Sequence, residues 1–397
     1  MVLVDADGSY CAEMPSSIRR SILFLSGARL ILNTTHRFVY PFLPAIARGL
    51  GVPLEQAALL ISVRHFAGLA TPATNNLVGQ GERRRRLITT GLALFIAGCA
   101  VTALSGVYVG ALVGFAFLGL AKPVFDVSSQ AYISDRVPYE RRARYLASFE
   151  FTWSISLLVG APLTGWLISK TDWATPFWVF GLIGAAAVLM LPRFVEADNR
   201  HAPAETPSSG LGRPALAFLV VVGLFTMAAE IIFVVFAAWL ENSFAVSVAV
   251  LGGAAFLIAA AELAGEGGTF AFTDRIGKRR AVMVGLVVSM AGYGALSFAS
   301  SNMAAGLALI GLAMFGFEFT IVSSFPLASE LVPASRGRYL GWLVFALGVG
   351  RGIGAALGPA LYSSFDLAGA AVAAMAANAL ALSVIATQLR DDQENVK

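Results

Sequence analysis

The chain has 397 residues, of which 57% are hydrophobic and 13% are charged, and its mean hydropathy is +0.74. A soluble domain usually carries about 25% charged residues, so the composition excludes an ordinary soluble protein. Apolar stretches of about 20 residues recur along the chain, each long enough to cross the hydrocarbon of a membrane as a helix, and no alternating strand pattern competes with them. We therefore expect an all-α membrane protein and exclude a β-barrel.

The net charge of +4 comes from short basic clusters between apolar runs, not from one basic patch interleaved with aromatic residues. Such clusters are typical of membrane topology, so we expect no nucleic-acid partner. Cys11 and Cys99 give neither metal-ligand spacing nor a disulfide framework, and we expect no metal and no cofactor. The first 20 residues place three acidic residues before Arg19, whereas a cleavable signal starts with basic residues, so we expect no removable signal.

The apolar runs and their breaks predict twelve transmembrane helices. Their limits are 21–46, 55–77, 87–105, 107–131, 145–169, 173–192, 214–240, 244–271, 281–299, 303–328, 339–362 and 367–389. The longest polar connection, 193–213, is rich in proline, glycine and serine and cannot bury enough apolar surface to fold alone. It is the expected cytoplasmic linker between two six-helix bundles at 21–192 and 214–389, which are flanked by cytoplasmic tails at 1–20 and 390–397.

The basic loops set the expected orientation. If both ends of the chain lie on one side, the arginine-rich connections lie there too, and the opposite loops offer only Arg48 and Lys170. The positive-inside rule then makes both termini cytoplasmic, in the plasma (inner) membrane. The basic residues on this side are Arg83 to Arg86, Arg136, Arg141, Arg142, Arg144, Arg275, Lys278, Arg279, Arg280, Arg336 and Arg338.

The two halves of the sequence resemble each other. The basic triplet 83–85 precedes the triplet 278–280 by 195 residues, and Val137 precedes Val332 by the same offset, each followed by proline. One constant offset across separate loops indicates an internal duplication.

Ionisable residues avoid every third predicted helix. Charges in lipid are expensive, so the charge-free third, sixth, ninth and twelfth spans should face lipid while the others surround a central polar pathway. This period is expected of two bundles that are each built from 3+3 repeats. The thirteen ionisable residues within spans are Arg29, His36, Arg37, Arg64, His65, Lys122, Asp126, Glu150, Glu230, Glu262, Glu266, Glu318 and Arg351.

Polar residues at helical spacing form one stripe along the first span and another along the fourth. The first consists of Arg29, Asn33, His36, Arg37 and Tyr40, and the second of Lys122, Asp126 and Gln130. Such a stripe requires water, a partner stripe or a ligand, so these residues either line a substrate cavity or pair with one another to hold helices together. The same two alternatives apply to Arg64, Glu150, Glu262, Glu266 and Arg351. Glu262 and Glu266 can also contact the basic loop that follows their span.

The segment 274–280, Asp-Arg-Ile-Gly-Lys-Arg-Arg, resembles the loop signature of the major facilitator superfamily, although Phe270 stands where that family has its leading glycine. The duplicate copy at 79–85 lacks the aspartate. The resemblance implies alternating access between two bundles and a loop whose carboxylate latches the halves on the cytoplasmic side; the alternative is that Asp274 only caps a short loop. The gate-loop residues are Asp274, Arg275, Gly277, Lys278 and Arg279.

Glycine and proline in the fifth span, at Gly160 and Pro162, are similar to a signature of the same family that is often linked to antiporters. The eleventh span carries Gly354, Gly358 and Pro359 as its counterpart. Small residues let helices approach closely and proline bends them, so we expect a tight interface that can rock. The arginine that the family carries in its fourth span is absent, which leaves the drug/proton antiporter branch open.

No Gly-rich loop ending in Gly-Lys-Ser/Thr is present, so the expected energy source is an ion gradient. The leading proton carriers are Glu230 and Glu318, which lie mid-span in the second half, with Asp126 opposite them. We expect a monomeric secondary transporter in membrane lipid that exchanges protons for small lipophilic or amphipathic compounds during export.

Two alternatives remain at this point. Uptake, or movement of an anionic or lipid-like substrate, is favoured if Arg37 and Arg64 bind an anionic headgroup instead of internal carboxylates. A membrane-embedded enzyme is disfavoured because Glu262 and Glu266 are the one close acidic pair and lack a nearby third metal ligand, and because no hydrolase motif is present.

Overall fold

The computed structural model describes residues 15–69, 84–197, 211–299, 301–332 and 336–389. Over these residues the chain is almost wholly α-helical. A helix satisfies each backbone N–H and C=O within its own segment, which is what an apolar run in lipid requires. The predicted tails 1–20 and 390–397, the linker 193–213 and the loop copy 79–85 lie partly or wholly outside the described residues.

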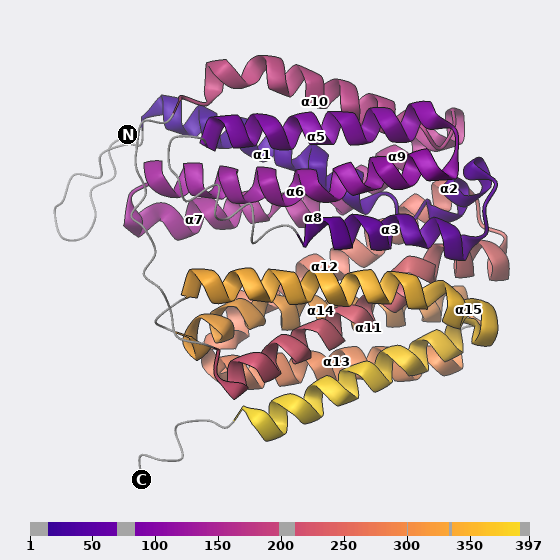
Figure 1. Cartoon of the computed structure of the whole chain (residues 1–397). Coiled ribbons are helices and arrows are strands. Elements are labelled where there is room, and N and C mark those ends of the chain that lie inside the picture. Colours follow the sequence, from indigo (N-terminus) through magenta and orange to yellow (C-terminus); the bar gives the residue numbers. More distant parts are fainter. Residues whose placement is uncertain (1–14, 70–83, 198–210, 300, 333–335, 390–397) are drawn as a thin grey trace, which may run out of the picture.

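Two bundles of helices lie one above the other in Figure 1, the first half of the chain in indigo to pink and the second in red to yellow. The first turn of α1 and the last turn of α15 lie at the same end, here termed the termini end, and α2 lies at the opposite, far end. The first bundle contains α1 Ser16–Arg37, α2 Leu43–Leu50, α3 Leu54–Gly68, α5 Arg84–Ser105, α6 Tyr108–Arg136, α7 Tyr139–Glu150, α8 Thr152–Leu158, α9 Gly160–Lys170 and α10 Thr175–Phe194. The second contains α11 Arg213–Phe244, α12 Val248–Ile276, α13 Lys278–Ala299, α14 Met303–Leu331 and α15 Arg336–Gln388.

The described helices agree with the twelve predicted spans. Nine are long and apolar enough to cross a membrane, with Ser148–Lys170 and α15 counted as one each. Helix α15 makes two passes because its backbone is non-helical at Phe365 and Asp366. The remaining two spans are α1, whose buried charged residues lower its hydropathy, and α3, which turns back from α2 through a bend of 111°.

The first predicted span, 21–46, is not one helix. Helix α1 ends at Arg37, the chain turns through buried aromatic residues, and α2 starts at Leu43. Pro44 occupies the first turn of α2, where its missing N–H and fixed φ are tolerated, whereas it would break the interior of a longer helix. Tyr40 therefore lies in the turn after α1 and not on the predicted helical stripe.

The fifth predicted span, 145–169, is also interrupted. It consists of α7, α8 and α9, with breaks at Phe151 and Val159. Pro162 cannot donate a backbone hydrogen bond to the residue four positions earlier, which explains the interruption beside it. The middle helix, α8, has seven residues and carries Trp153, which lines the pocket described below.

The two bundles contact each other mainly through α3 against α15 and through α8 and α9 against α12. At Gly252 of α12, an added methyl group would lie 3.1 Å from the Ala161 carbonyl oxygen of α9. At the far end, Arg48 of α2 binds both carboxylate oxygens of Glu241 on α11, at 2.6 and 3.2 Å. These contacts hold the two bundles together, at the site described next and at the far end.

Candidate substrate and ion-pair site

The first bundle contains a closed charge network between α1, α6 and α7. Arg29 binds Asp126 at 3.1 Å and Glu150 at 2.7 Å. Lys122 binds the other oxygen of Asp126 at 2.6 Å and the side-chain oxygen of Asn33 at 2.7 Å. Every member of this network belongs to the same half, so we name it the N-half network.

A second set of contacts crosses between the halves. The guanidinium of Arg37, at the end of α1, forms an ion pair with Glu262 near the middle of α12, and the two side chains are 2% and 4% exposed. Arg37 also donates to the Trp153 carbonyl oxygen at 3.2 Å, while its Nε has no hydrogen-bond partner. The predicted alternative contact of Glu262 with the basic loop is therefore wrong in this structure.

Glu230, near the middle of α11, is bound from both halves. Tyr40 donates its hydroxyl to Glu230 at 2.6 Å, His65 Nε2 lies 3.5 Å away, and Arg351 of α15 reaches the other carboxylate oxygen at 3.5 Å. Arg64 supports this arrangement by donating to the Tyr40 hydroxyl at 3.3 Å. Together with Arg37 and Glu262, these residues form what we name the inter-half cluster.

Two predicted residues of the first half, His36 and Arg64, do not bind carboxylates directly. His36 contacts the Leu32 carbonyl oxygen of its own helix at 3.1 Å, and its own carbonyl accepts a hydrogen bond from Arg64 at 2.7 Å. Arg64 thus meets backbone and tyrosine oxygens, and Glu230 lies beyond the tyrosine.

The two remaining acids of the second half differ from Glu230 and Glu262. Glu266, one turn along α12, accepts a hydrogen bond from Ser154 of the first half at 2.6 Å and does not reach the basic loop. Glu318 of α14 is buried beside Gly265 of α12. Within the described residues it has no hydrogen bond or ion pair.

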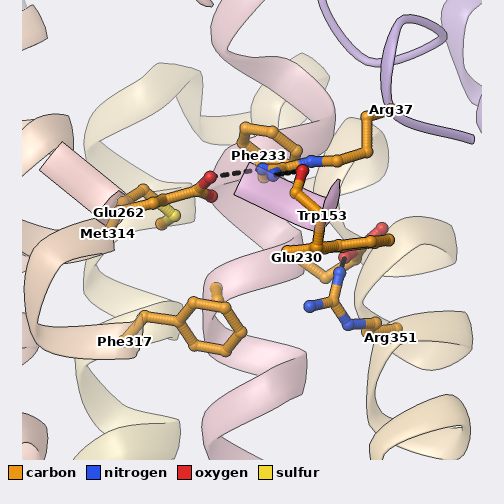
Figure 2. A pocket seen from close by; sticks show the side chains of 9 residues that line it. Arg37, Trp153, Glu230, Phe233, Glu262, Met314, Phe317 and Arg351 are labelled. Atoms are coloured by element: carbon orange, nitrogen blue, oxygen red, sulfur yellow. Dashed lines mark hydrogen bonds and ion pairs between the residues drawn. The ribbon is translucent and has the colours of Figure 1, made fainter. Parts of the chain in front are cut away.

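A small pocket lies at the centre of the inter-half cluster, and Figure 2 shows Arg37 and Glu262 joined across it, with Glu230 and Arg351 beside them. Its space suffices for about one water molecule, so a larger compound can enter only if the lining moves. The lining consists of Arg37, Trp153, Ala229, Glu230, Phe233, Glu262, Met314, Phe317 and Arg351.

Trp153 lies between the N-half network and the inter-half cluster. The ring centroid lies 4.7 Å from the Arg37 guanidinium, 5.2 Å from Lys122 Nζ and 5.8 Å from the Arg351 guanidinium. Attraction between a cation and an aromatic face is worth roughly 0.5–2 kcal/mol, and more where water is excluded. Three cations from three different helices therefore lie around one indole ring.

The predicted gate loop lies away from this site. Asp274 is exposed and forms no hydrogen bond or ion pair within the described part of the chain. Lys278 pairs with Glu330 of α14, and Arg279 donates to the Ala386 carbonyl oxygen at 3.2 Å, so both attach the loop to its own half. Arg275 is exposed, and Gly277 adopts a φ of 87° at the sharp turn between α12 and α13.

The glycines of the packing prediction lie at close helix contacts. Added methyl groups at Gly354 and Gly358 would lie 2.6 and 2.7 Å from backbone oxygens of α11, and one at Gly160 would meet Thr34 of α1. These contacts are within one half, whereas Pro162 lies against Gly252 of the other half. Pro359 lies inside α15.

Phe233, Met314 and Phe317 line the pocket but are missing from the residues predicted by sequence. Apolar residues fill every span of this chain, and most of them face lipid or the core. The one available signal is position: Phe317 precedes Glu318, and Phe233 lies three residues after Glu230, close to one helical turn.

Two helical bundles that meet around a polar pocket halfway along their helices define a membrane transport protein. The sequence profile of the Major Facilitator Superfamily matches residues 25–261 and 216–396. The chain belongs to this superfamily, which confirms the resemblance carried by the loop 274–280 and makes the protein a transporter and not an enzyme.

Among curated relatives, the multidrug resistance protein MdtL of Escherichia coli (strain K12 / DH10B) is 31% identical over 192 residues, 46% of this chain and 48% of that protein. The uncharacterized MFS-type transporter YwfA of Bacillus subtilis (strain 168) is 29% identical over 144 residues, 36% of this chain and 34% of YwfA. The alignments thus span about a third to a half of these relatives.

Among solved structures, a bacterial homologue of the human lysosomal transporter Spinster, in an inward-facing and occupied conformation, superimposes with a TM-score of 0.74. The match covers 94% of this chain and 97% of that chain at 13% sequence identity. At this identity the likeness establishes the fold alone.

Proposed function

We propose that this transporter exports small lipophilic or amphipathic compounds in exchange for protons, by alternating access of its two bundles to a site at the inter-half cluster. The proposal places it in the inner membrane with both termini cytoplasmic, as the basic loops indicate. One chain supplies both walls of the site, so we propose that it acts as a monomer. The name of the multidrug relative is consistent with this direction of transport.

The observation that carries the proposal is the position of Glu318. This carboxylate is 6% exposed, and within the described residues it has no cationic partner. Glu230 and Asp126, the other candidate carriers, are held by two or more donors each. Glu318 is thus the candidate that can accept or release a proton without the loss of an ion pair. We propose it as the leading proton carrier.

Inverted membrane vesicles with an imposed pH gradient, acidic inside, test the proposal. A panel of fluorescent amphipathic compounds is added, and an exported compound should accumulate inside while protons leave. Glu318→Gln should abolish accumulation driven by the gradient and leave exchange of compound across the membrane intact. Glu330→Gln, an exposed acid on the same helix, is the matched control and should behave as wild type.

Gradient-driven accumulation that persists in Glu318→Gln would contradict the assignment of the carrier. Accumulation in right-side-out vesicles alone would contradict export and favour the second candidate function, uptake of an anionic compound. The observation that supports this second candidate is the group of first-half cations around Trp153.

A further inference from the structure

The two halves present opposite charges to the central site. Of the thirteen ionisable residues within the predicted spans, the first half contributes four Arg or Lys residues and two acids, while the second contributes one arginine and four acids. The first-half residues are Arg29, Arg37, Arg64, Lys122, Asp126 and Glu150, beside two histidines. The second-half residues are Glu230, Glu262, Glu266, Glu318 and Arg351. One wall is therefore basic in excess and the other is acidic in excess.

The Arg37–Glu262 ion pair is where the two walls meet directly. Both side chains are at least nine-tenths buried, and Arg37 is held in position by the ring and the carbonyl oxygen of Trp153. Removing one partner of a buried pair leaves an uncompensated charge, which is far more costly than keeping the pair. A compound that lies between the two residues in the closed site therefore has to replace the partner of each charge.

A bound compound has to come between these two residues, because the pocket around them holds about one water molecule. An anion would satisfy Arg37 and leave Glu262 without a cation. A cation would satisfy Glu262 and leave Arg37 without an anion. A compound that carries both charges satisfies both residues at once.

We infer that the substrate is a dipolar amphipath whose anionic group binds Arg37, whose cationic group binds Glu262, and whose apolar body lies against Phe233, Met314 and Phe317. This inference rests on the proposed function, since it names the charge class of the compound carried. The apolar lining accommodates an aromatic body, and the unpartnered Nε of Arg37 offers one more donor to a carboxylate.

Four matched compounds test the inference on the purified full chain: 4-phenylphenylalanine, its methyl ester, its N-acetyl derivative and its N-acetyl methyl ester. At about pH 6 these are a zwitterion, a cation, an anion and a neutral molecule of nearly the same shape. Binding is measured by titration of the thermal stabilisation of the protein. The zwitterion should bind at least about tenfold more tightly than each of the other three, because each of these leaves a buried charge unpaired.

Two variants assign each charge to its residue. Arg37→Gln should remove the advantage of compounds with a carboxylate, and Glu262→Gln should remove the advantage of compounds with an ammonium group. If either single variant fails to fold, the exchanged pair Arg37→Glu with Glu262→Arg keeps one charge of each sign and should retain the zwitterion preference. Arg193→Gln, an exposed residue near the end of α10, is the control and should leave all four affinities unchanged.

Equal binding of the four compounds, tighter binding of the ester or of the N-acetyl derivative, or an unchanged preference in both single variants would overturn the inference. Binding is measured here without a pH gradient, so the result does not depend on proton coupling. Export driven by protons together with equal binding of the four compounds would overturn this inference alone. Preferred binding of the zwitterion without gradient-driven transport would overturn the proposed function alone.

Discussion

The N-half network and the inter-half cluster are both built from buried ion pairs, but they differ in what they join. Arg29, Asp126 and Lys122 belong to one bundle, so their contacts persist however the two bundles move. Arg37 and Glu262 belong to different bundles, so their contact cannot survive if the bundles separate at the site. The same chemistry therefore stabilises a rigid unit in one place and one conformation of the molecule in the other.

Breaking the N-half network should have the largest effect on stability. Arg29→Gln leaves Asp126 with one cation and Glu150 with none, in a region where Arg29 itself is 4% exposed. We expect the free energy of unfolding to fall by about 3 kcal/mol. Thermal or denaturant unfolding of the purified protein measures this, and Arg193→Gln, near the end of α10, serves as control. An unchanged midpoint would contradict the view of this network as a structural unit.

Substitutions at two glycines test the difference between helix contacts within one bundle and helix contacts between the two bundles. Gly354→Val inserts methyl groups between α15 and α11 of the same bundle, and we expect a loss of roughly 1–3 kcal/mol in unfolding free energy. Gly252→Val inserts them between α12 and α9 of different bundles, where the bundles can separate to relieve the strain. Unfolding should change less, and the far end should open.

Spin labels at Leu50 and Asn242, at the far ends of α2 and α11, measure this opening as a longer distance between the labels. The Gly354→Val protein should keep the wild-type distance. If both variants lose the same stability and neither changes the distance, the distinction between contacts within a bundle and contacts between bundles is wrong.

The far-end pair should show the smallest effect. Arg48 is 60% exposed and Glu241 is 14% exposed, so water screens their attraction and Arg48→Gln should change the free energy of unfolding by less than about 1 kcal/mol. The label distance should nevertheless broaden, and the exchanged pair Arg48→Glu with Glu241→Arg should restore it. A large fall in the free energy of unfolding of Arg48→Gln would contradict the view that water screens this pair, and would make it comparable to the buried pair Arg37–Glu262.

Hydropathy and charge placement predicted most of the fold, because a helix in lipid must be apolar along about 20 residues and such runs are visible without any partner. The breaks in the first and fifth spans were not predicted. Pro44 and Pro162 were visible, but a proline inside an apolar run can kink a membrane helix or end it. Tertiary packing decides between these outcomes, as in the buried turn that precedes Pro44.

The members of the site were largely visible as charged residues in apolar runs, whereas their pairing was not. Arg37 and Glu262 are 225 residues apart in the sequence. From the sequence alone, several carboxylates were possible partners of Arg37, and a nearby basic loop was a possible partner of Glu262. Which pair forms depends on the relative placement of two bundles. The apolar pocket wall at Phe233, Met314 and Phe317 was hidden for a different reason, since lipid-facing residues have the same composition.

The short helix α8 carries a consequence for how this transporter can be altered. Breaks at Phe151 and Val159 separate α8, with Trp153 at the pocket, from α9, whose residues pack against α12 toward the far end. The wall of the pocket and the bundle contact at the far end are thus located on different pieces of one interrupted membrane segment. A substitution in α8 can therefore alter the pocket wall while the packing of α9 against α12 stays as it is.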